Sequence, residues 1–275
     1  MVLDPIVTAH ELSQLSEVAL LDCRPDEGAY RTSHLPGAFH AQLERDLSAP
    51  SADPARGGRH PLPDLQQFAT RLGQWGITPT THVVAYDDQH GANAAARLWW
   101  LLKALGHERV RVVDGGLTAL SAAGLTLTGD VPVLKSAAPY PATTWVRPLA
   151  DIDEVERART RKDRRLLDVR AAFRYRGESE PIDPVAGHIP GAINLPLSDN
   201  LQPDGTFKDS AALRAMYERA LAGCAPTQTI VHCGSGVTAC HTLLALERAG
   251  LLGAKLYVGS WSEWCRQPER AREPG

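Results

Sequence analysis

The stretch Thr229–Cys240, which reads TIVHCGSGVTAC, is the part of the chain on which the interpretation of the rest depends. A short apolar run ends at Cys233, a loop with two glycines follows, and the residues His241–Arg248 have the pattern of a helix. Gly234 and Gly236 let the loop backbone adopt conformations that a side chain would obstruct. A helix that begins directly after the loop turns unpaired N–H groups and the positive end of its dipole toward it. Because the thiolate is the reactive form of cysteine and such a loop favours an anion, the pattern predicts that Cys233 is a nucleophile.

The composition is that of a globular protein with nearly balanced charge. The chain has 275 residues, of which 43% are hydrophobic and 22% charged, and its formal net charge is −3. This length suggests two domains, and the charge gives no sign of a nucleic-acid or anionic-membrane partner. The apolar runs are too short to span a bilayer, and the first residues lack the pattern of a signal peptide. Five cysteines without metal-ligand spacing argue against a disulfide framework, so we expect a cytoplasmic protein.

Four short patterns occur twice in the chain, in the same order and at a nearly constant separation. They are LLDCR at 20–24 and LLDVR at 166–170; HLPGA at 34–38 and HIPGA at 188–192; HVVAYD at 82–87 and TIVHC at 229–233; and, more loosely, GGLTAL at 115–120 and GSWSEW at 259–264. A repeat that is this long and only twofold indicates a duplicated domain. Asp87 stands in the first copy where Cys233 stands in the second, so only one of the two equivalent strand ends carries a thiol.

The repeat predicts two domains, residues 1–130 and 149–275, joined by a proline-rich linker at 131–148. Within each copy, short apolar runs alternate with helix-like stretches such as residues 94–106. This alternation is typical of an α/β fold in which helices flank a mostly parallel sheet. Ligands of such sheets bind where the carboxyl ends of strands meet the N-termini of helices, and Cys233 is expected at a junction of this kind.

Taken together, these motifs resemble those of the two-domain rhodanese-type sulfurtransferases, and the resemblance covers nearly the whole chain. It is carried by Asp-x-Arg after the first strand of each copy, by HIPGA at 188–192 and by CGSGVTA at 233–239. The resemblance implies tandem rhodanese-like domains, of which the first, with Asp87, is non-catalytic. It also implies that Cys233 takes sulfane sulfur from a small anionic donor and holds it as a persulfide. The acceptor would be cyanide, a thiol or a thioredoxin-like protein, and no metal or organic cofactor would be needed.

The same resemblance leaves two sulfur donors open. The loop at 233–238 is similar to that of 3-mercaptopyruvate sulfurtransferases, whereas thiosulfate-using rhodaneses carry a basic pair where this chain has Gly234 and Ser235. The resemblance implies that Arg174 binds the donor anion and that a second arginine should stand at the position of Asp183. Arg176 is a substitute if the surrounding insertion folds differently. We expect 3-mercaptopyruvate to be the donor, with thiosulfate as the alternative.

Further candidate site residues lie in the loop and in the first copy. The substrate-binding candidates in the loop are Gly234, Ser235, Gly236, Val237 and Thr238. Their backbone N–H groups, with the hydroxyls of Ser235 and Thr238, are expected to stabilise charge on the transferred sulfur. His60 and Arg97 are secondary candidates that could face the site from the first copy.

Two other functions use a similar arrangement of strand, loop and helix. Cysteine-dependent phosphatases need an arginine six residues after the cysteine, and this chain has Ala239 there. A redox sensor or a non-catalytic sulfur-binding module would use the same thiol without turnover. Catalytic turnover and a stable persulfide at Cys233 would distinguish a sulfurtransferase from these alternatives.

Overall fold

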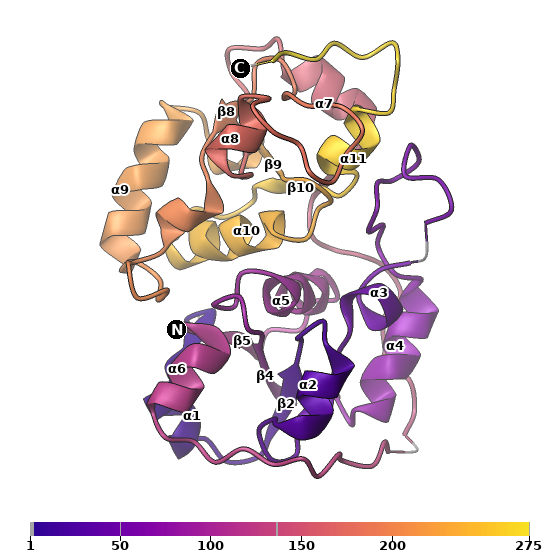
Figure 1. Ribbon diagram of the computed structural model, residues 1–275, viewed down its shortest axis with the longest axis vertical. Helices are drawn as coiled ribbons and strands as arrows, with labels where there is room; N and C mark the ends of the chain where they lie inside the picture. The colour runs from indigo at the N-terminus through magenta and orange to yellow at the C-terminus, as the bar shows by residue number, and fades with distance from the viewer. Residues whose placement is uncertain (1–2, 50, 136, 275) are drawn as a thin grey trace. The chain divides into compact units, whose positions relative to one another are not determined.

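The computed structural model describes residues 3–49, 51–135 and 137–274 (Figure 1). By its contacts the chain divides into two compact units. One comprises Met1–Ala49, Leu62–Arg147 and Pro203–Thr206, and the other comprises Pro50–Pro61, Pro148–Gln202 and Phe207–Gly275. Two short segments, 50–61 and 203–206, are therefore grouped differently from the boundaries that the repeat predicts.

The first unit is a five-stranded parallel sheet with helices around it. The strands lie in the order β1 (Ile6–Val7), β5 (Val110–Val113), β4 (His82–Tyr86), β2 (Val18–Asp22) and β3 (Phe39–His40). Its helices are α1 (Ala9–Gln14), α2 (Glu27–Thr32), α3 (Leu43–Asp46), α4 (Leu65–Gln74), α5 (Ala94–Ala104) and α6 (Gly116–Ala122). Every residue of the central strand β4 and of α5, the helix that follows it, is buried.

The second unit repeats this topology. Its parallel strands lie in the order β6 (Leu149–Ala150), β10 (Lys255–Tyr257), β9 (Thr229–His232), β7 (Arg165–Asp168) and β8 (Ile193–Asn194). Its helices are α7 (Ile152–Ala158), α8 (Ala172–Tyr175), α9 (Ser210–Leu221), α10 (Ala239–Arg248) and α11 (Ser260–Trp264), with short 3₁₀ turns η1 (Leu197–Asn200) and η2 (Pro226–Gln228). The predicted fold class, a duplicated α/β domain built on a parallel sheet, is confirmed.

The Asp-x-Arg motif ties together the loops at the carboxyl end of each sheet. In the second unit, Nη2 of Arg170 lies 2.6 Å from Oδ2 of Asp168 and donates a second hydrogen bond to the carbonyl of Gly187 at 2.8 Å. Arg24 and Asp22 form the same pair, also at 2.6 Å, in the first unit. Each arginine is buried with its carboxylate, so the charge is compensated where water is excluded.

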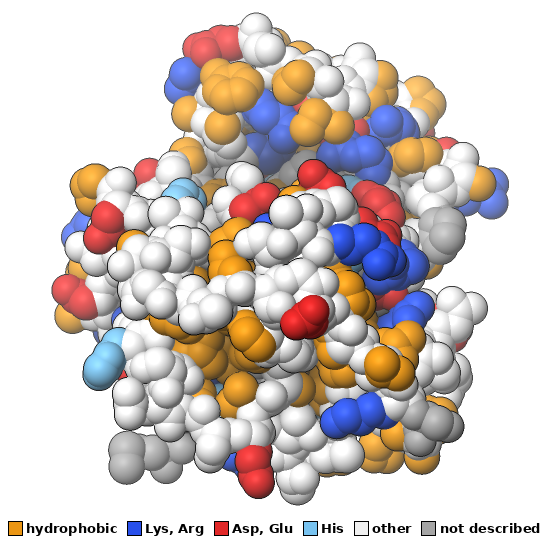
Figure 2. Space-filling model, turned by 60° about the horizontal axis from the view of Figure 1, so that its bottom comes forward, with side chains coloured by type: hydrophobic (Ala, Val, Ile, Leu, Met, Phe, Trp, Pro, Cys, Tyr) orange, Lys and Arg blue, Asp and Glu red, His pale blue; other side chains and the backbone are white. Residues whose placement is uncertain are grey.

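The surface carries charges of both signs. Figure 2 shows Lys and Arg side chains beside Asp and Glu side chains on the face in view, with apolar side chains between them. Among the described residues, no helix is long and apolar enough to cross a membrane.

Candidate active site

Cys233 is the first residue after β9, at the end of the central strand of the second sheet. It is only 1% exposed. Its N–H donates to Oγ of Ser260 at 3.2 Å, and its carbonyl accepts from the N–H of Trp261 at 3.1 Å. Ser260 in turn donates to the carbonyl of Tyr257 at 2.8 Å. The start of α11 therefore holds the backbone of Cys233 on both sides, and this fixes where its side chain begins.

The loop that follows Cys233 needs both of its glycines. Gly236 has a φ of +75°, and a Cβ atom built there would lie 2.4 Å from the carbonyl oxygen of Val258. A side chain at this position would therefore combine backbone strain with a clash against rigid backbone. A Cβ atom at Gly234 would lie 3.3 Å from Nη2 of Arg59 and 3.4 Å from Nη1 of Arg174. The glycine thus lets two guanidinium groups approach the loop closely.

Several backbone N–H groups of this loop lack an acceptor among the described residues. Among the described residues, none accepts a hydrogen bond from the N–H groups of Gly234, Ser235 or Val237–Ala239. They lie before and at the start of α10, a helix of ten residues whose N-terminus carries a partial positive charge. Such a set of amides can stabilise an anion without reorganising.

In the first unit, the loop that follows β4 is equivalent to the Cys233 loop, and its N–H groups bind the carboxylate of Asp87. Asp87 follows β4 as Cys233 follows β9, and its carboxylate accepts hydrogen bonds from four backbone N–H groups. The donors are Gln89 at 2.9 Å, Gly91 at 2.8 Å, Asn93 at 3.1 Å and Ala95 at 3.1 Å. Burial raises the pKa of Asp87, and these four hydrogen bonds oppose that rise. The loop after β4 is therefore filled by the chain's own carboxylate.

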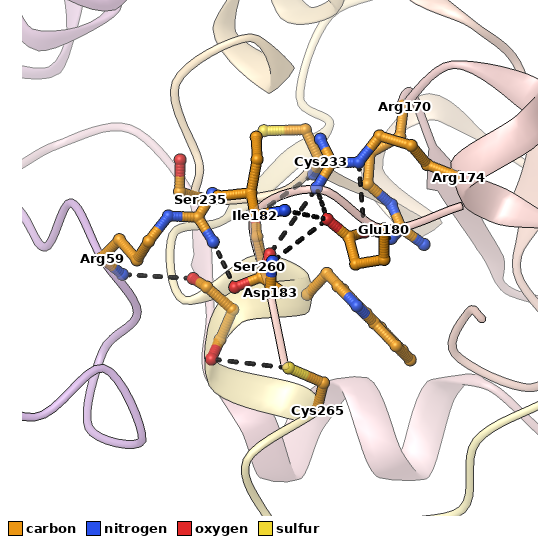
Figure 3. Close-up of polar contacts among 12 residues, drawn as sticks. Arg59, Arg170, Arg174, Glu180, Ile182, Asp183, Cys233, Ser235, Ser260 and Cys265 are labelled. Atoms are coloured by element: carbon orange, nitrogen blue, oxygen red, sulfur yellow. Dashed lines mark hydrogen bonds and ion pairs between the residues drawn. The ribbon is translucent and has the colours of Figure 1, made fainter. Parts of the chain in front are cut away.

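Arg174, a predicted substrate-binding residue, lies on α8, and the structure places its guanidinium group beside Gly234. Glu180 holds it through two hydrogen bonds, from Nη2 at 2.7 Å and from Nε at 3.1 Å. Its side chain is 14% exposed, and Nη1 is the atom of Arg174 nearest to Gly234. The two contacts with Glu180 fix the plane of the guanidinium group (Figure 3), and Nη1 takes part in neither of them.

Arg59 is the arginine that sequence reasoning missed. It belongs to the segment 51–61, which precedes the first-copy helix α4 in the chain but is grouped with the second unit. Its Nη1 forms an ion pair with Oδ1 of Asp183, the residue that stands where a second arginine was expected. Figure 3 shows Arg59 and Arg174 reaching toward Asp183 and the loop from different sides. The sequence contains one signal for it, because Arg59 stands directly before the predicted candidate His60.

The remaining predicted residues differ in the contacts that they make. Nδ1 of His60 lies 2.7 Å from Oγ of Ser235, so this secondary candidate does contact the loop. Val237 is buried and Thr238 is half-buried at the start of α10. Arg176 is half-exposed and pairs with Glu178 at 2.6 Å, so the structure does not bring it to Gly234. Nε of Arg97, in α5 of the first unit, donates to the carbonyl of Leu47 at 3.3 Å.

A buried histidine lies directly before the candidate nucleophile. His232 is fully buried, and its Nε2 lies 4.0 Å from Oδ2 of Asp168. Burial lowers the pKa of His232, which keeps the imidazole neutral at pH 7. A neutral ring adds no positive charge next to Cys233, whereas nitrogens of Arg59 and Arg174 lie 3.3 and 3.4 Å from the Cβ position of Gly234.

Comparisons with known proteins agree with this architecture. The family model of the rhodanese-like domain matches residues 8–123 and 151–267. A probable 3-mercaptopyruvate sulfurtransferase of Pseudomonas aeruginosa is 45% identical over 96% of this chain and 96% of its own length. A putative thiosulfate sulfurtransferase, SseB, of Mycobacterium tuberculosis is 38% identical over 96% of this chain and 95% of its own. The crystal structure of SseA from Escherichia coli, a 3-mercaptopyruvate sulfotransferase, superimposes with a TM-score of 0.78 at 28% identity, covering 94% of this chain and 99% of that one. With two matched domains that span most of its length, the chain belongs to the rhodanese family.

Proposed function

We propose that this protein is a sulfurtransferase that moves sulfane sulfur from 3-mercaptopyruvate to a thiol or cyanide through a persulfide on Cys233. The observation that carries the proposal is the loop around Cys233, in which a thiol, unpaired backbone amides and the guanidinium groups of Arg174 and Arg59 meet at Gly234. A nucleophile and an anion-binding site in direct contact suit a small donor that is itself an anion. The names of the P. aeruginosa and M. tuberculosis relatives support the same reaction class.

In the first step, the Cys233 thiolate attacks the sulfur atom of 3-mercaptopyruvate. A bond forms between Sγ and that sulfur, and the bond between the sulfur and carbon 3 breaks. The electron pair of the broken bond goes to carbon 3, which takes up the proton that the donor thiol carried. The products are pyruvate and a Cys233 persulfide anion, so atoms and charge balance without an oxidant or reductant.

In the second step, an acceptor removes the outer sulfur and restores the thiolate. Cyanide attacks this sulfur, the S–S bond breaks and thiocyanate leaves. A thiol acceptor gives its own persulfide in the same way, and its proton goes with the product. Between the two steps the outer sulfur is negatively charged, and the N–H groups of Gly234, Ser235 and Val237–Ala239 are the donors available to stabilise it.

The residues beside the loop have separate roles in this scheme. Arg174 binds the donor carboxylate, because Glu180 already fixes its plane and leaves Nη1 facing the loop. Ser235 stands two residues after Cys233 in the chain, and its hydroxyl is within hydrogen-bond distance of His60. It assists the proton transfer to carbon 3. The first domain is non-catalytic, since Asp87 fills the loop in which a persulfide would otherwise lie.

The chemistry of the loop favours 3-mercaptopyruvate as the donor. Gly234 and Ser235 add no charge directly after the nucleophile, so the cations lie to the side, where they can bind a carboxylate and a neighbouring oxygen while the donor sulfur meets Cys233. Thiosulfate carries its negative oxygens on the sulfur atom that is bonded to the transferred sulfur, so it would need cations directly after the nucleophile, where this chain has Gly234 and Ser235. We therefore expect a higher kcat/KM for 3-mercaptopyruvate than for thiosulfate.

The proposal is tested by measuring pyruvate and thiocyanate formation with each donor. Cys233→Ser should lose turnover with both, whereas Cys224→Ser, at a partly exposed cysteine before the opposite end of β9, should keep it. Mass spectrometry of the donor-treated protein without acceptor should find one added sulfur on the Cys233 peptide. Full turnover by Cys233→Ser would refute the proposal, and a preference for thiosulfate would change the donor but keep the reaction class.

A further inference from the structure

The segment 51–61 is anchored to the second unit by backbone contacts. The N–H of Gly57 donates to Oε1 of Glu263 at 2.8 Å, and the N–H of Arg59 donates to Oγ of Ser262 at 3.1 Å. Gly58, between them, has a φ of +81°, and a Cβ atom there would lie 2.5 Å from the carbonyl oxygen of Gly259. A third anchor joins Nε2 of Gln267 to the carbonyl of Ala55 at 2.6 Å. The backbone that carries Arg59 is therefore held against the residues around α11.

The two terminal nitrogens of Arg59 have different neighbours. Nη1 pairs with Oδ1 of Asp183, and Nη2 lies 3.3 Å from the Cβ position of Gly234. The nearest other atoms to that position are Nη1 and Nη2 of Arg174, at 3.4 and 3.5 Å. The nitrogens of two arginines thus converge on one point directly after Cys233.

Asp183 does not present a negative charge to the donor. Its side chain is fully buried and lies among three arginines. Besides the pair with Arg59, Oδ1 lies 2.9 Å from Nη1 of Arg266, and Oδ2 lies 3.6 Å from Nη2 of Arg174. A carboxylate enclosed by cations in this way orients them, as a charge-assisted hydrogen bond fixes both partners. The aspartate at the expected arginine position is therefore compatible with an anionic substrate.

From this geometry we infer that Arg59 is a second donor-binding residue, which acts opposite Arg174 and is aimed at the donor by Asp183. The inference rests on the proposed function and adds to it the residue that the sequence lacks at position 183. Arg59 and Arg174 keep 21% and 14% of their side-chain surface exposed, whereas Cys233 is 1% exposed. An anion from solvent therefore meets the guanidinium groups before it meets the thiol. The ligand class is a small carboxylate with a second oxygen on the adjacent carbon, which two guanidinium forks can bind at once.

Steady-state kinetics with 3-mercaptopyruvate test this role. Arg59→Ala should raise KM at least about tenfold, since a charged hydrogen bond to the substrate is lost. Arg59→Lys should recover only part of the loss, because an ammonium group cannot pair with Asp183 and face Gly234 in the same fork geometry. Arg31→Ala, at an exposed arginine paired with Glu27 on α2, serves as the control and should leave KM unchanged.

A second variant separates donor binding from support of the fold. Arg59→Ala leaves the buried Asp183 with one cation fewer, and this alone could disturb the site. The double variant Arg59→Ala/Asp183→Asn removes the uncompensated charge. If Arg59 binds the donor, KM stays high in the double variant. If KM returns to the wild-type value, Arg59 only neutralises Asp183 and the inference is overturned.

Alkylation of Cys233 gives a readout that needs no sulfur transfer. Iodoacetate is an anion and iodoacetamide is neutral, so the ratio of their rates at Cys233, followed by peptide mass spectrometry, reports the cations beside the thiol. We expect this ratio to fall at least about fivefold in Arg59→Ala and to stay constant in Arg31→Ala. An unchanged ratio would overturn the inference about Arg59. Absence of turnover in the wild type would instead refute the proposed function, and the alkylation ratio would still measure Arg59.

Discussion

Nδ1 of His60 lies 2.7 Å from Oγ of Ser235, although the two residues are 175 positions apart in the chain. The imidazole therefore orients the hydroxyl that stands two residues after the candidate nucleophile, and it can exchange a proton with it.

This pair predicts coupled effects on the reaction. Ser235→Ala and His60→Gln should each lower kcat/KM for 3-mercaptopyruvate about ten- to a hundredfold, the lower part of the range for acid–base assistance. If the two groups act as one unit, the double variant should be no worse than the poorer single variant. Ser198→Ala, at an exposed serine of η1, is the control. Additive losses, or single variants as active as the wild type, would contradict the coupling.

Asp87 is predicted to be a stability residue. Asp87→Asn keeps the size of the side chain but turns an NH₂ group toward some of the four backbone N–H donors. We expect the free energy of unfolding to fall by about 2–4 kcal/mol, measured by urea denaturation of the whole chain. Asp88→Asn, at the exposed neighbouring residue, should change it by less than about 0.5 kcal/mol. Where Asp87→Asn is still folded, kcat/KM should equal that of the wild type; a large fall would show that the first domain takes part in the reaction.

Gly236 is predicted to be required for the shape of the Cys233 loop. Gly236→Ala should destabilise the protein by more than about 2 kcal/mol, because a positive φ is strained and the methyl group meets the carbonyl of Val258. Gly223→Ala is a matched control, since Gly223 also has a positive φ, +84°, but its Cβ position has no neighbour within 4 Å. It should cost about 1 kcal/mol and leave activity intact. Equal effects of both substitutions on unfolding and on turnover would contradict the clash.

His241 is predicted to make the protein sensitive to acid. It is buried in α10, stacks on Phe207 with ring centroids 4.5 Å apart, and burial lowers its pKa to about 3. Between pH 6.5 and 3 the unfolded chain binds a proton at this histidine and the folded chain does not, so stability falls as the pH falls. The slope is at most about 1.4 kcal/mol per pH unit from this one group.

Chemical denaturation at several pH values measures this contribution. His241→Gln should flatten the dependence of the unfolding free energy on pH below 6.5, whereas His10→Gln, at an exposed position on α1, should follow the wild type. An equally steep loss of stability in His241→Gln and in the wild type would place the acid sensitivity elsewhere.

The parts of the molecule that depend on local sequence were predictable. The run that ends at Cys233, the glycines after it and the helix pattern that follows lie within one short stretch, and the structure has β9, a loop and α10 there. The same holds for the repeat, because equivalent strands carry equivalent residues: β4 and β9 both take the central place in their sheets. Asp87 could be matched to Cys233 for this reason alone.

The surroundings of the nucleophile were predicted only in part. Arg174 was identified because it lies in a motif close to the HIPGA pattern, and the structure places it beside Gly234. Asp183 stands where a second arginine was expected, and its pairing with three arginines could not be predicted because they are not adjacent to it in the sequence. Arg176 was named as a substitute on proximity in sequence, yet its guanidinium group pairs with Glu178.

By itself, the sequence determined the duplicated α/β fold, the position of Cys233 at a strand end and the backbone freedom of its loop. These follow from the periodicity of apolar residues and from glycines at fixed places, which act over a few neighbouring residues. Only the tertiary structure decided which cations face that loop. Arg59 and Asp183 are 124 residues apart, and no local pattern encodes a pair that forms only after segment 51–61 has packed on the residues around α11.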